Sequence, residues 1–250
     1  MPCTSLYDFT AGAPKRVPQQ MPPKEFTIGD LHIVDLTKVL DPNTESRRCR
    51  LWRFNTGGVI PDFHTLMDLT SHLGTHCECP YHHDEDWPSV AELPLSQFMG
   101  RGLYVVIDEL PENAEITAAS LEKHLGAKIK PGDTVIIDSP YRIPPFTPAT
   151  NGPTDHRLHV GAESAQWLAD HGVQSVGFGD GVTIEDSEEN VKPFHDILMA
   201  KNCTFLEVLQ NLDLLKTDTF FISYAPMNII GLDSCPVRAY AIEGLAEFSR

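Results

Sequence analysis

The amino-acid sequence predicts a single α/β domain built from a mixed sheet with flanking helices. Short apolar runs typical of strands recur along the chain, and amphipathic helical patterns lie between them. The chain has 250 residues, and a single domain of this size buries roughly 70–75% of its unfolded surface. It therefore needs no disulfide bonds to hold a compact fold, and the sequence shows no internal repeat.

Composition and charge narrow the choice of partners and location. The formal net charge of −16 opposes binding to nucleic acid or to an anionic membrane, because both require Lys and Arg to neutralise phosphates. The N-terminus shows no signal peptide, and no apolar stretch is long enough to span a membrane. The six cysteines show no paired framework, which is typical of reduced thiols. We expect a cytoplasmic protein that acts on a small-molecule substrate, without nucleic-acid or membrane partners.

The first elements follow a proline-rich beginning. Residues 1–28 lack a hydrophobic period and are expected to form an arm that wraps the surface or a partner subunit, ahead of a domain over residues 29–250. Strands are expected over 31–36, 51–54 and 63–69. The last two alternate apolar and polar residues, as half-buried strands do.

Strand and helix patterns then alternate to the C-terminus. Apolar runs predict strands over 103–108, 134–138, 173–178, 203–206, 219–224 and 239–242. Helical patterns cover 117–125, 161–171, 194–200 and 208–215, and Thr117 is the expected N-cap of the first of these. Five prolines between residues 140 and 155 predict a long loop. A loop of that length inside a domain is more often functional than idle.

The candidate chemistry concentrates in residues 71–83, which read Ser-His-Leu-Gly-Thr-His-Cys-Glu-Cys-Pro-Tyr-His-His. Imidazole, carboxylate and thiolate groups bind zinc and its first-row neighbours. A helix carrying His72 and His76 one turn apart is disfavoured by the glycine between them and by Pro80, so an irregular strand-to-loop segment is expected. Burying these imidazoles with Glu78 would leave polar groups that a metal ion can satisfy.

Alternation along an extended segment separates the remaining candidates. Cys77 and Cys79 would point away from the histidine and glutamate ligands, so they are expected to be packed thiols. A structural Cys/His zinc site, which would use one or both, is the competing interpretation. His82 keeps the even spacing of the ligands and is favoured over His83 to face the pocket. A histidine that titrates near neutrality suits proton transfer there.

Residues 72–82, His-Leu-Gly-Thr-His-Cys-Glu-Cys-Pro-Tyr-His, resemble the H-x-G-T-H-x-D-x-P-x-H motif of the Putative cyclase superfamily. This family includes bacterial kynurenine formamidase, isatin hydrolase and trans-dienelactone hydrolase. Further similar segments extend the resemblance over about residues 30–243. They are 35–37, 89–100, 161–177, 195–207 and 235–239.

The resemblance implies a swivelling β/β/α architecture and a homodimer or homotetramer with sites near the subunit contact. It implies that His72, His76 and Glu78 hold a first divalent metal ion. It also implies that His195 and Glu207 complete a second metal position or the shell around the first. His82 would be the general base.

Two departures from the family pattern bear on function. Glu78 stands where the family usually has Asp, which leaves open whether the site holds one ion or two. Zinc is favoured and manganese is the alternative, because both accept imidazole and carboxylate ligands. Residues 137–142 replace an Arg-Thr-Gly-Trp stretch found in many members, so N-formylkynurenine is not the predicted substrate.

The leading hypothesis is a metal-dependent hydrolase of a small amide, lactam or lactone, similar to arylformamidases and isatin hydrolases and acting on C–N bonds. Metal-activated water would attack the carbonyl carbon, with His82 taking the proton. One alternative is a non-catalytic zinc-binding module, which would unfold when the metal is removed. The other is a metal-dependent lyase or cyclase that uses the same ligands.

Overall fold

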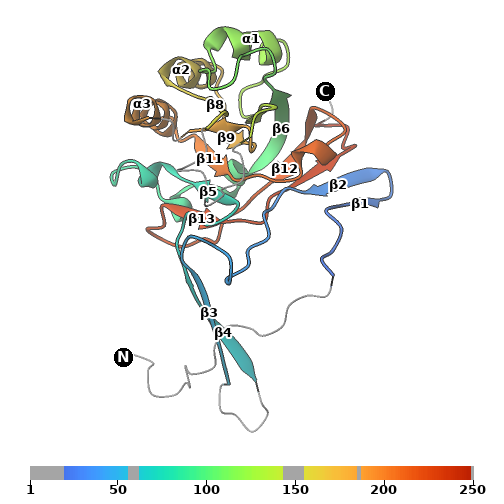
Figure 1. The fold of residues 1–250 in the computed structure, drawn as a ribbon, viewed down its shortest axis with the longest axis vertical. Helices are drawn as coiled ribbons and strands as arrows, with labels where there is room; N and C mark the ends of the chain where they lie inside the picture. The colour runs from blue at the N-terminus through green and yellow to red at the C-terminus, as the bar shows by residue number, and fades with distance from the viewer. Residues whose placement is uncertain (1–19, 56–61, 143–154, 185–186, 249–250) are drawn as a thin grey trace, which may run out of the picture.

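The computed structural model describes residues 20–55, 62–142, 155–184 and 187–248. Within these ranges the chain forms one ten-stranded mixed sheet, two small two-stranded sheets and three α-helices (Figure 1). The strands of the large sheet are β1 (Glu25–Ile28), β2 (Leu31–Asp35), β5 (His76–Glu78), β6 (Met99–Val106), β7 (Thr134–Asp138), β9 (Ser175–Phe178), β11 (Thr204–Glu207), β12 (Thr219–Ser223), β13 (Ser234–Pro236) and β14 (Tyr240–Glu243).

The strand order of the large sheet is β1-β2-β14-β12-β6-β7-β9-β11-β5-β13. The central strands β6, β7, β9 and β11 run parallel, and the flanking pairs are antiparallel. Strands β8 (Leu158–His159) and β10 (Val182–Thr183) form one small sheet, and β3 (Cys49–Asn55) and β4 (Phe63–Leu69) form the other. The prediction of a mixed α/β fold is confirmed.

The three helices cover one face of the sheet (Figure 1). They are α1 (Ala118–Leu125), α2 (Ala162–Asp170) and α3 (Glu188–Met199). Val135 and Ile137 of β7 pack into the core on the helix side, whereas Ile136 between them packs into a second core on the opposite side. Parallel strands covered on both faces bury both sets of side chains, which explains why β7 reads as a continuous apolar run.

Most predicted elements occur near their expected positions, and α1 has its N-cap at Thr117 as expected. The helix predicted over 208–215 is wrong. Val208 and Asn211 both adopt positive φ, at 55° and 60°, which breaks any helix, and one short 3₁₀ turn at Leu212–Leu214 remains. Helix α3 begins at Glu188, earlier than the predicted residue 194, because it tolerates Pro193.

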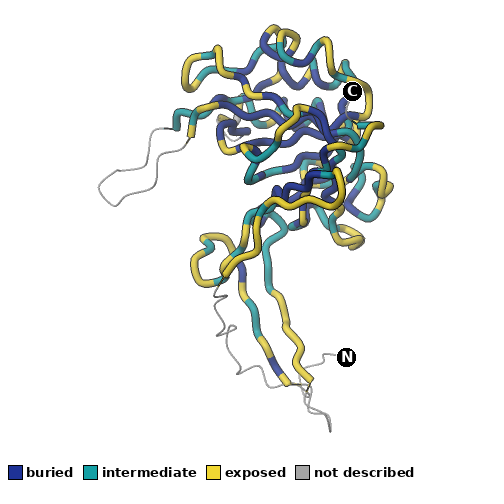
Figure 2. The backbone as a smooth tube through the Cα atoms, turned by 90° about the vertical axis from the view of Figure 1, so that its right-hand side faces the viewer, coloured by how far each residue is buried: buried dark blue, intermediate teal, exposed yellow. Residues whose placement is uncertain are grey.

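Strands β3 and β4 form a two-stranded ribbon that projects from the body of the molecule (Figures 1 and 2). The prediction that both are half-buried is wrong for β4, whose first five residues are exposed. Phe63, Leu66 and Met67 are each about half exposed or more. The alternating pattern is typical of a strand, but it does not show that β3 and β4 pair with each other outside the large sheet.

Parts of the predicted arm and loop lie outside the described residues, namely 1–19 and 143–154. Strand β1 falls within the range 1–28 that was expected to be an arm, and its pairing with β2 places residues 25–28 in the sheet. Among the described residues no helix is both long enough and apolar enough to cross a lipid bilayer.

Asp35 ends β2 and ties the C-terminal segment to it. Its carboxylate accepts hydrogen bonds from the Arg238 guanidinium at 2.6 and 3.1 Å and from the backbone N–H of Thr37 at 3.1 Å. Burial alone would raise the pKa of Asp35, but these hydrogen bonds hold it below its ordinary value. The folded protein therefore stabilises the charged form of Asp35 over its protonated form.

We expect Asp35→Asn to lower the free energy of unfolding by about 1–2 kcal/mol at pH 7, because hydrogen bonds to a charged group are lost. A lowered pKa stabilises the fold above the unfolded value near 3.9 and loses this contribution as the pH falls through the folded value. The gap between wild type and variant in urea unfolding should therefore shrink below about pH 4. An equal gap at pH 3 and pH 7 would contradict the assignment.

Candidate metal centre

Strand β5 carries the middle of the histidine-rich segment and lies between β11 and β13. The antiparallel register places Glu207 of β11 opposite His76, and Phe205 opposite Glu78. Because alternate side chains share a face, His76, Glu78 and Glu207 project from the same side as Phe205, which packs into the helix-side core. Strand pairing thus brings two segments far apart in sequence to one site.

Glu78 is buried among imidazole rings, with 3% of its surface exposed. Its Oε1 lies 2.6 Å from Nδ1 of His72 and 3.3 Å from Nε2 of His76. Its Oε2 lies 3.8 Å from Nε2 of His195, beyond hydrogen-bonding distance, and has no hydrogen-bond partner among the described residues. A buried carboxylate oxygen without a partner is destabilising, so this atom marks a position suited to a cation.

Two of the imidazoles are fixed in one tautomer by backbone carbonyls. The Nδ1–H of His76 donates to the carbonyl oxygen of Gly74 at 2.8 Å, and that of His195 donates to Val191 at 2.7 Å. Each Nε2 then presents its lone pair toward Glu78 when the ring is neutral. Gly74 adopts φ +58°, a region that favours glycine, so the turn that supplies this carbonyl depends on glycine. Metal-binding histidines commonly use their second nitrogen in this way.

A carboxylate orients His72. Its Nδ1 faces Glu78, and its Nε2 lies 2.9 Å from Oδ2 of Asp233, to which it donates when Nδ1 is free to bind a cation. The same Oδ2 lies 3.5 Å from Nδ1 of His82. The rings of His72 and His82 are 4.4 Å apart between centroids. Asp233 directly precedes β13, so a segment near the C-terminal end of the chain also reaches both histidines.

The clustered charges shift the pKa values of these groups. Burial opposes ionisation of Glu78, but the imidazole of His195 beside Oε2 and the contacts of His72 and His76 with Oε1 hold its pKa well below the usual range. Burial would lower the pKa of His72, yet its contacts with Glu78 and Asp233 raise it to about 9. Burial lowers the pKa of His82, and the charges of His72 and His195 add to that effect against the attraction of Glu78. Glu78 is therefore charged at neutral pH, and His82 is uncharged.

The structure brings all six predicted site residues together. They are His72, His76, Glu78, His82, His195 and Glu207. Potential ligand atoms of five of them, all except His195, form two groups in which all atoms lie within 4.8 Å of one another. One group contains His72 and His82, the other contains His76 and Glu207, and Glu78 belongs to both. The resemblance had assigned His72 and His76 to one ion, whereas here they fall on either side of the shared carboxylate.

His83 and the two cysteines make other contacts. Nδ1 of His83 lies 2.6 Å from Oδ1 of Asp196, and its ring stacks on that of His195 with centroids 4.9 Å apart. Cys77 and Cys79 are fully buried in the core on the opposite side of β5. The prediction that they are packed thiols is confirmed, and no cysteine among the described residues joins a group able to hold a metal ion.

Two polar residues of this site were missed by sequence reasoning. Asp233 lies two residues before the segment 235–239 that supported the resemblance, and nothing local distinguishes it from other loop aspartates. Arg47 lies just before β3, and its Nη1 donates to the backbone carbonyl oxygen of His72 at 2.8 Å. Only the fold places these two side chains beside the histidines.

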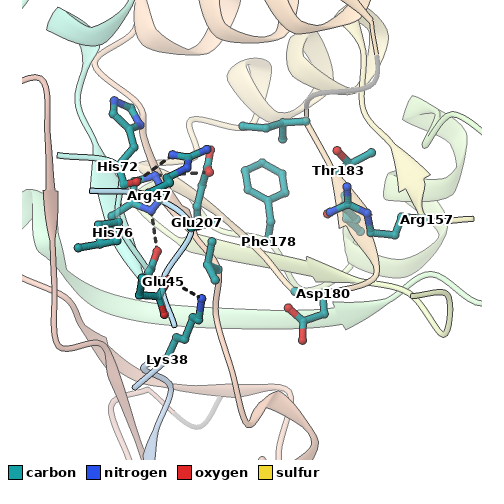
Figure 3. A pocket seen from close by; sticks show the side chains of 17 residues that line it. Lys38, Glu45, Arg47, His72, His76, Arg157, Phe178, Asp180, Thr183 and Glu207 are labelled. Atoms are coloured by element: carbon teal, nitrogen blue, oxygen red, sulfur yellow. Dashed lines mark hydrogen bonds and ion pairs between the residues drawn. The ribbon is translucent and has the colours of Figure 1, made fainter. Parts of the chain in front are cut away.

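Two adjacent hollows meet at the cluster. The inner one has a volume of about 250 Å³ and is lined by residues that include Glu78, His82 and His195. The outer one, of about 300 Å³, extends from the histidines toward Phe178 and Arg157 (Figure 3). The residues that line both are Arg47, His72, Ile184 and Glu207. Hollows of this size fit a small molecule.

The donor set fits a divalent metal ion. Imidazole nitrogens and carboxylate oxygens converge, and Oε2 of Glu78 offers a buried negative atom without a hydrogen-bond partner among the described residues. Zinc and manganese both accept these ligand types. The arrangement can therefore hold a cation beside a histidine that is uncharged at neutral pH.

Comparisons with known proteins identify the family and relatives of the fold. The family model described as "Putative cyclase" matches residues 34–185. Kynurenine formamidase from Erythrobacter litoralis is 27% identical over 214 residues, which are 83% of this chain and 92% of that protein. Isatin hydrolase A from Labrenzia aggregata, bound to benzyl benzoate, is 24% identical with a TM-score of 0.64, over 86% of this chain and 94% of that one. A predicted metal-dependent hydrolase from Bacillus stearothermophilus is 20% identical with a TM-score of 0.62, over 86% and 99%.

We expect Glu78→Gln to weaken zinc binding by at least about 100-fold, because the charge that both ligand groups share is removed without a change in size. A competition titration against a chelator measures the affinity directly. Glu85→Gln, an exposed change nearby in sequence, is the matched control and should bind zinc as the wild type does. Undiminished affinity in a folded Glu78→Gln protein would rule out Glu78 as the shared ligand.

Proposed function

The chain belongs to the Putative cyclase family, and we propose that it is a metal-dependent hydrolase that opens a small amide, lactam or lactone. The observation that carries this proposal is Oε2 of Glu78, which has no hydrogen-bond partner among the described residues and is buried among four imidazoles beside a hollow that can admit a small molecule. The names of the similar proteins, a kynurenine formamidase and isatin hydrolases, support hydrolysis of C–N bonds in particular.

We assign the metal-binding role to His72, His76, Glu78, His195 and Glu207, with zinc as the expected ion and manganese as the alternative. When bound, a divalent ion lowers the pKa of water and polarises a carbonyl group. The protein's own contribution is to hold the imidazoles in fixed tautomers through Gly74 and Val191. It also keeps Glu78 charged and limits the site to small hollows.

His82 is the proposed general base. Its Nδ1 faces Asp233 at 3.5 Å, which leaves Nε2 to take a proton from the attacking water and later deliver it to the leaving nitrogen or oxygen. Asp233 would stabilise the imidazolium that forms, as a carboxylate beside a catalytic histidine does. Because Asp233 also contacts His72, one carboxylate aligns a metal ligand with the base.

A purely structural zinc module is less well supported. Such sites are usually closed tetrahedral arrangements rich in cysteine, whereas Cys77 and Cys79 lie on the far face of β5. Solvent-reachable hollows next to the ligands favour a site that receives a substrate.

We expect His82→Gln to lower kcat by about 10²–10⁴-fold with metal content unchanged, because only proton transfer is lost. Substrates would come from a panel of aryl formamides, lactams and lactones, assayed by product analysis. Loss of metal from His82→Gln would instead make His82 a ligand. Hydrolysis at full rate by folded protein stripped of metal would overturn the metal dependence of the proposed reaction.

The protruding ribbon supports a homodimer or homotetramer. A two-stranded ribbon is marginally stable alone, and β4 exposes Phe63, Leu66 and Met67. Residues 47–69 carry four arginines and two aspartates in a chain of net charge −16. Two ribbons would repel each other, whereas a ribbon and the acidic body of another copy would attract. We therefore propose that each ribbon packs on the body of a second subunit.

Replacing Leu66 and Met67 together by Glu should convert the assembly to monomers, because it places two charges in the apolar contact. Light scattering coupled to gel filtration measures the mass. Leu95→Glu is the control, since Leu95 is at least as exposed (62%) as Leu66 and Met67 but lies outside the ribbon. A wild-type protein that is monomeric at micromolar concentration would contradict this mode of assembly.

A further inference from the structure

Arg47 stands where the two hollows join. It lines both of them together with His72, Ile184 and Glu207; Figure 3 shows Arg47 beside His72 and Glu207 in the outer one. A ligand that occupies the inner hollow with its reacting group and the outer hollow with its remainder would lie against the residues that line both, and Arg47 is the permanently charged cation among them. A group of the ligand that touches Arg47 is therefore close to the bond that reacts.

Arg47 is also held in place. It lies just before β3, and His72 follows shortly after β4, so the hydrogen bond from its Nη1 to the His72 carbonyl closes the base of the ribbon. This bond uses one of the five N–H donors of the guanidinium. The others have no hydrogen-bond acceptor among the described residues.

The other cations of the outer hollow are already paired. Lys38 lies 3.2 Å from Glu45, and Arg157 forms a two-pronged contact with Asp155 at 2.8 to 3.1 Å. Arg47, in contrast, forms no ion pair with any carboxylate in the part of the chain that the structure describes. It is the cation of this hollow that has its charge and its donors available for a ligand.

The surroundings of Arg47 indicate which kind of ligand its positive charge favours. The chain as a whole has a net charge of −16 and repels anions, so an anionic ligand needs a local cation to enter. The nearby carboxylates are engaged: Glu207 contacts His76, and Asp180 on the far wall is bound by Gln210. The donors of Arg47 that have no acceptor among the described residues can match a carboxylate in geometry and charge.

We infer that Arg47 is a carboxylate-binding residue and that the substrate is an anionic amide, lactam or lactone. Its carboxylate lies next to the scissile group, at the junction of the two hollows. This inference rests on the proposed hydrolase function for the reaction, but not for the binding.

The test is equilibrium binding of benzoate and of benzamide, its neutral isostere, to the purified protein with its metal bound, measured by calorimetry. Wild type should prefer benzoate. Arg47→Gln should weaken benzoate binding at least about tenfold and leave benzamide and metal content unchanged. Arg50→Gln is the matched control, because Arg50 is an exposed arginine of the same ribbon that lines neither hollow. It should behave as wild type.

A second arm uses 2-formamidobenzoate and its methyl ester as substrates. Arg47→Gln should raise KM for the acid and leave kcat and the ester kinetics nearly unchanged. Equal losses for the acid and the ester, or benzoate binding indifferent to Arg47, would overturn the inference. Benzoate binding that depends on Arg47 without hydrolysis of either compound would instead sustain the subsite and refute the proposed hydrolase function.

Discussion

The burial of one carboxylate, Glu78, is the constraint on which the rest of the site depends. Its charge lies away from solvent on a short strand inside a ten-stranded sheet. A buried charge is tolerated only where opposite charge and hydrogen bonds surround it. His72 and His76 come from its own segment, while α3 supplies His195. The converging elements are therefore best understood as the means of stabilising this carboxylate and whatever cation joins it.

Strand alternation gives β5 one polar face and one apolar face. The face toward the helices carries His76 and Glu78, and the opposite face carries Cys77 in an apolar core. The pairing with β11 then adds Glu207 to the polar face. A shift of register by one residue would exchange the thiol and ligand faces, so packing of the core and geometry of the site specify the same register.

The sequence alone was sufficient for the parts of the site governed by local pattern. The orientation of Cys77 and Cys79 followed from the period of two, and glycine with proline ruled out a helix. His195 and Glu207 came only from the family resemblance, because their approach depends on how β11 and α3 pack. Asp233 and Arg47 carried no local signal at all.

For the fold, too, local sequence pattern predicted some elements and failed for others. Apolar runs such as residues 134–138 predicted β7, while the positive φ values of Val208 and Asn211 ended an apparently helical stretch.

The most direct test of the central claim is an anomalous difference map, recorded at the zinc and manganese absorption edges from crystals of the protein. We expect a peak about 2.0–2.2 Å from a Glu78 oxygen and close to the imidazole nitrogens. A fully metal-loaded crystal with its peak elsewhere, and none at Glu78, would contradict the account.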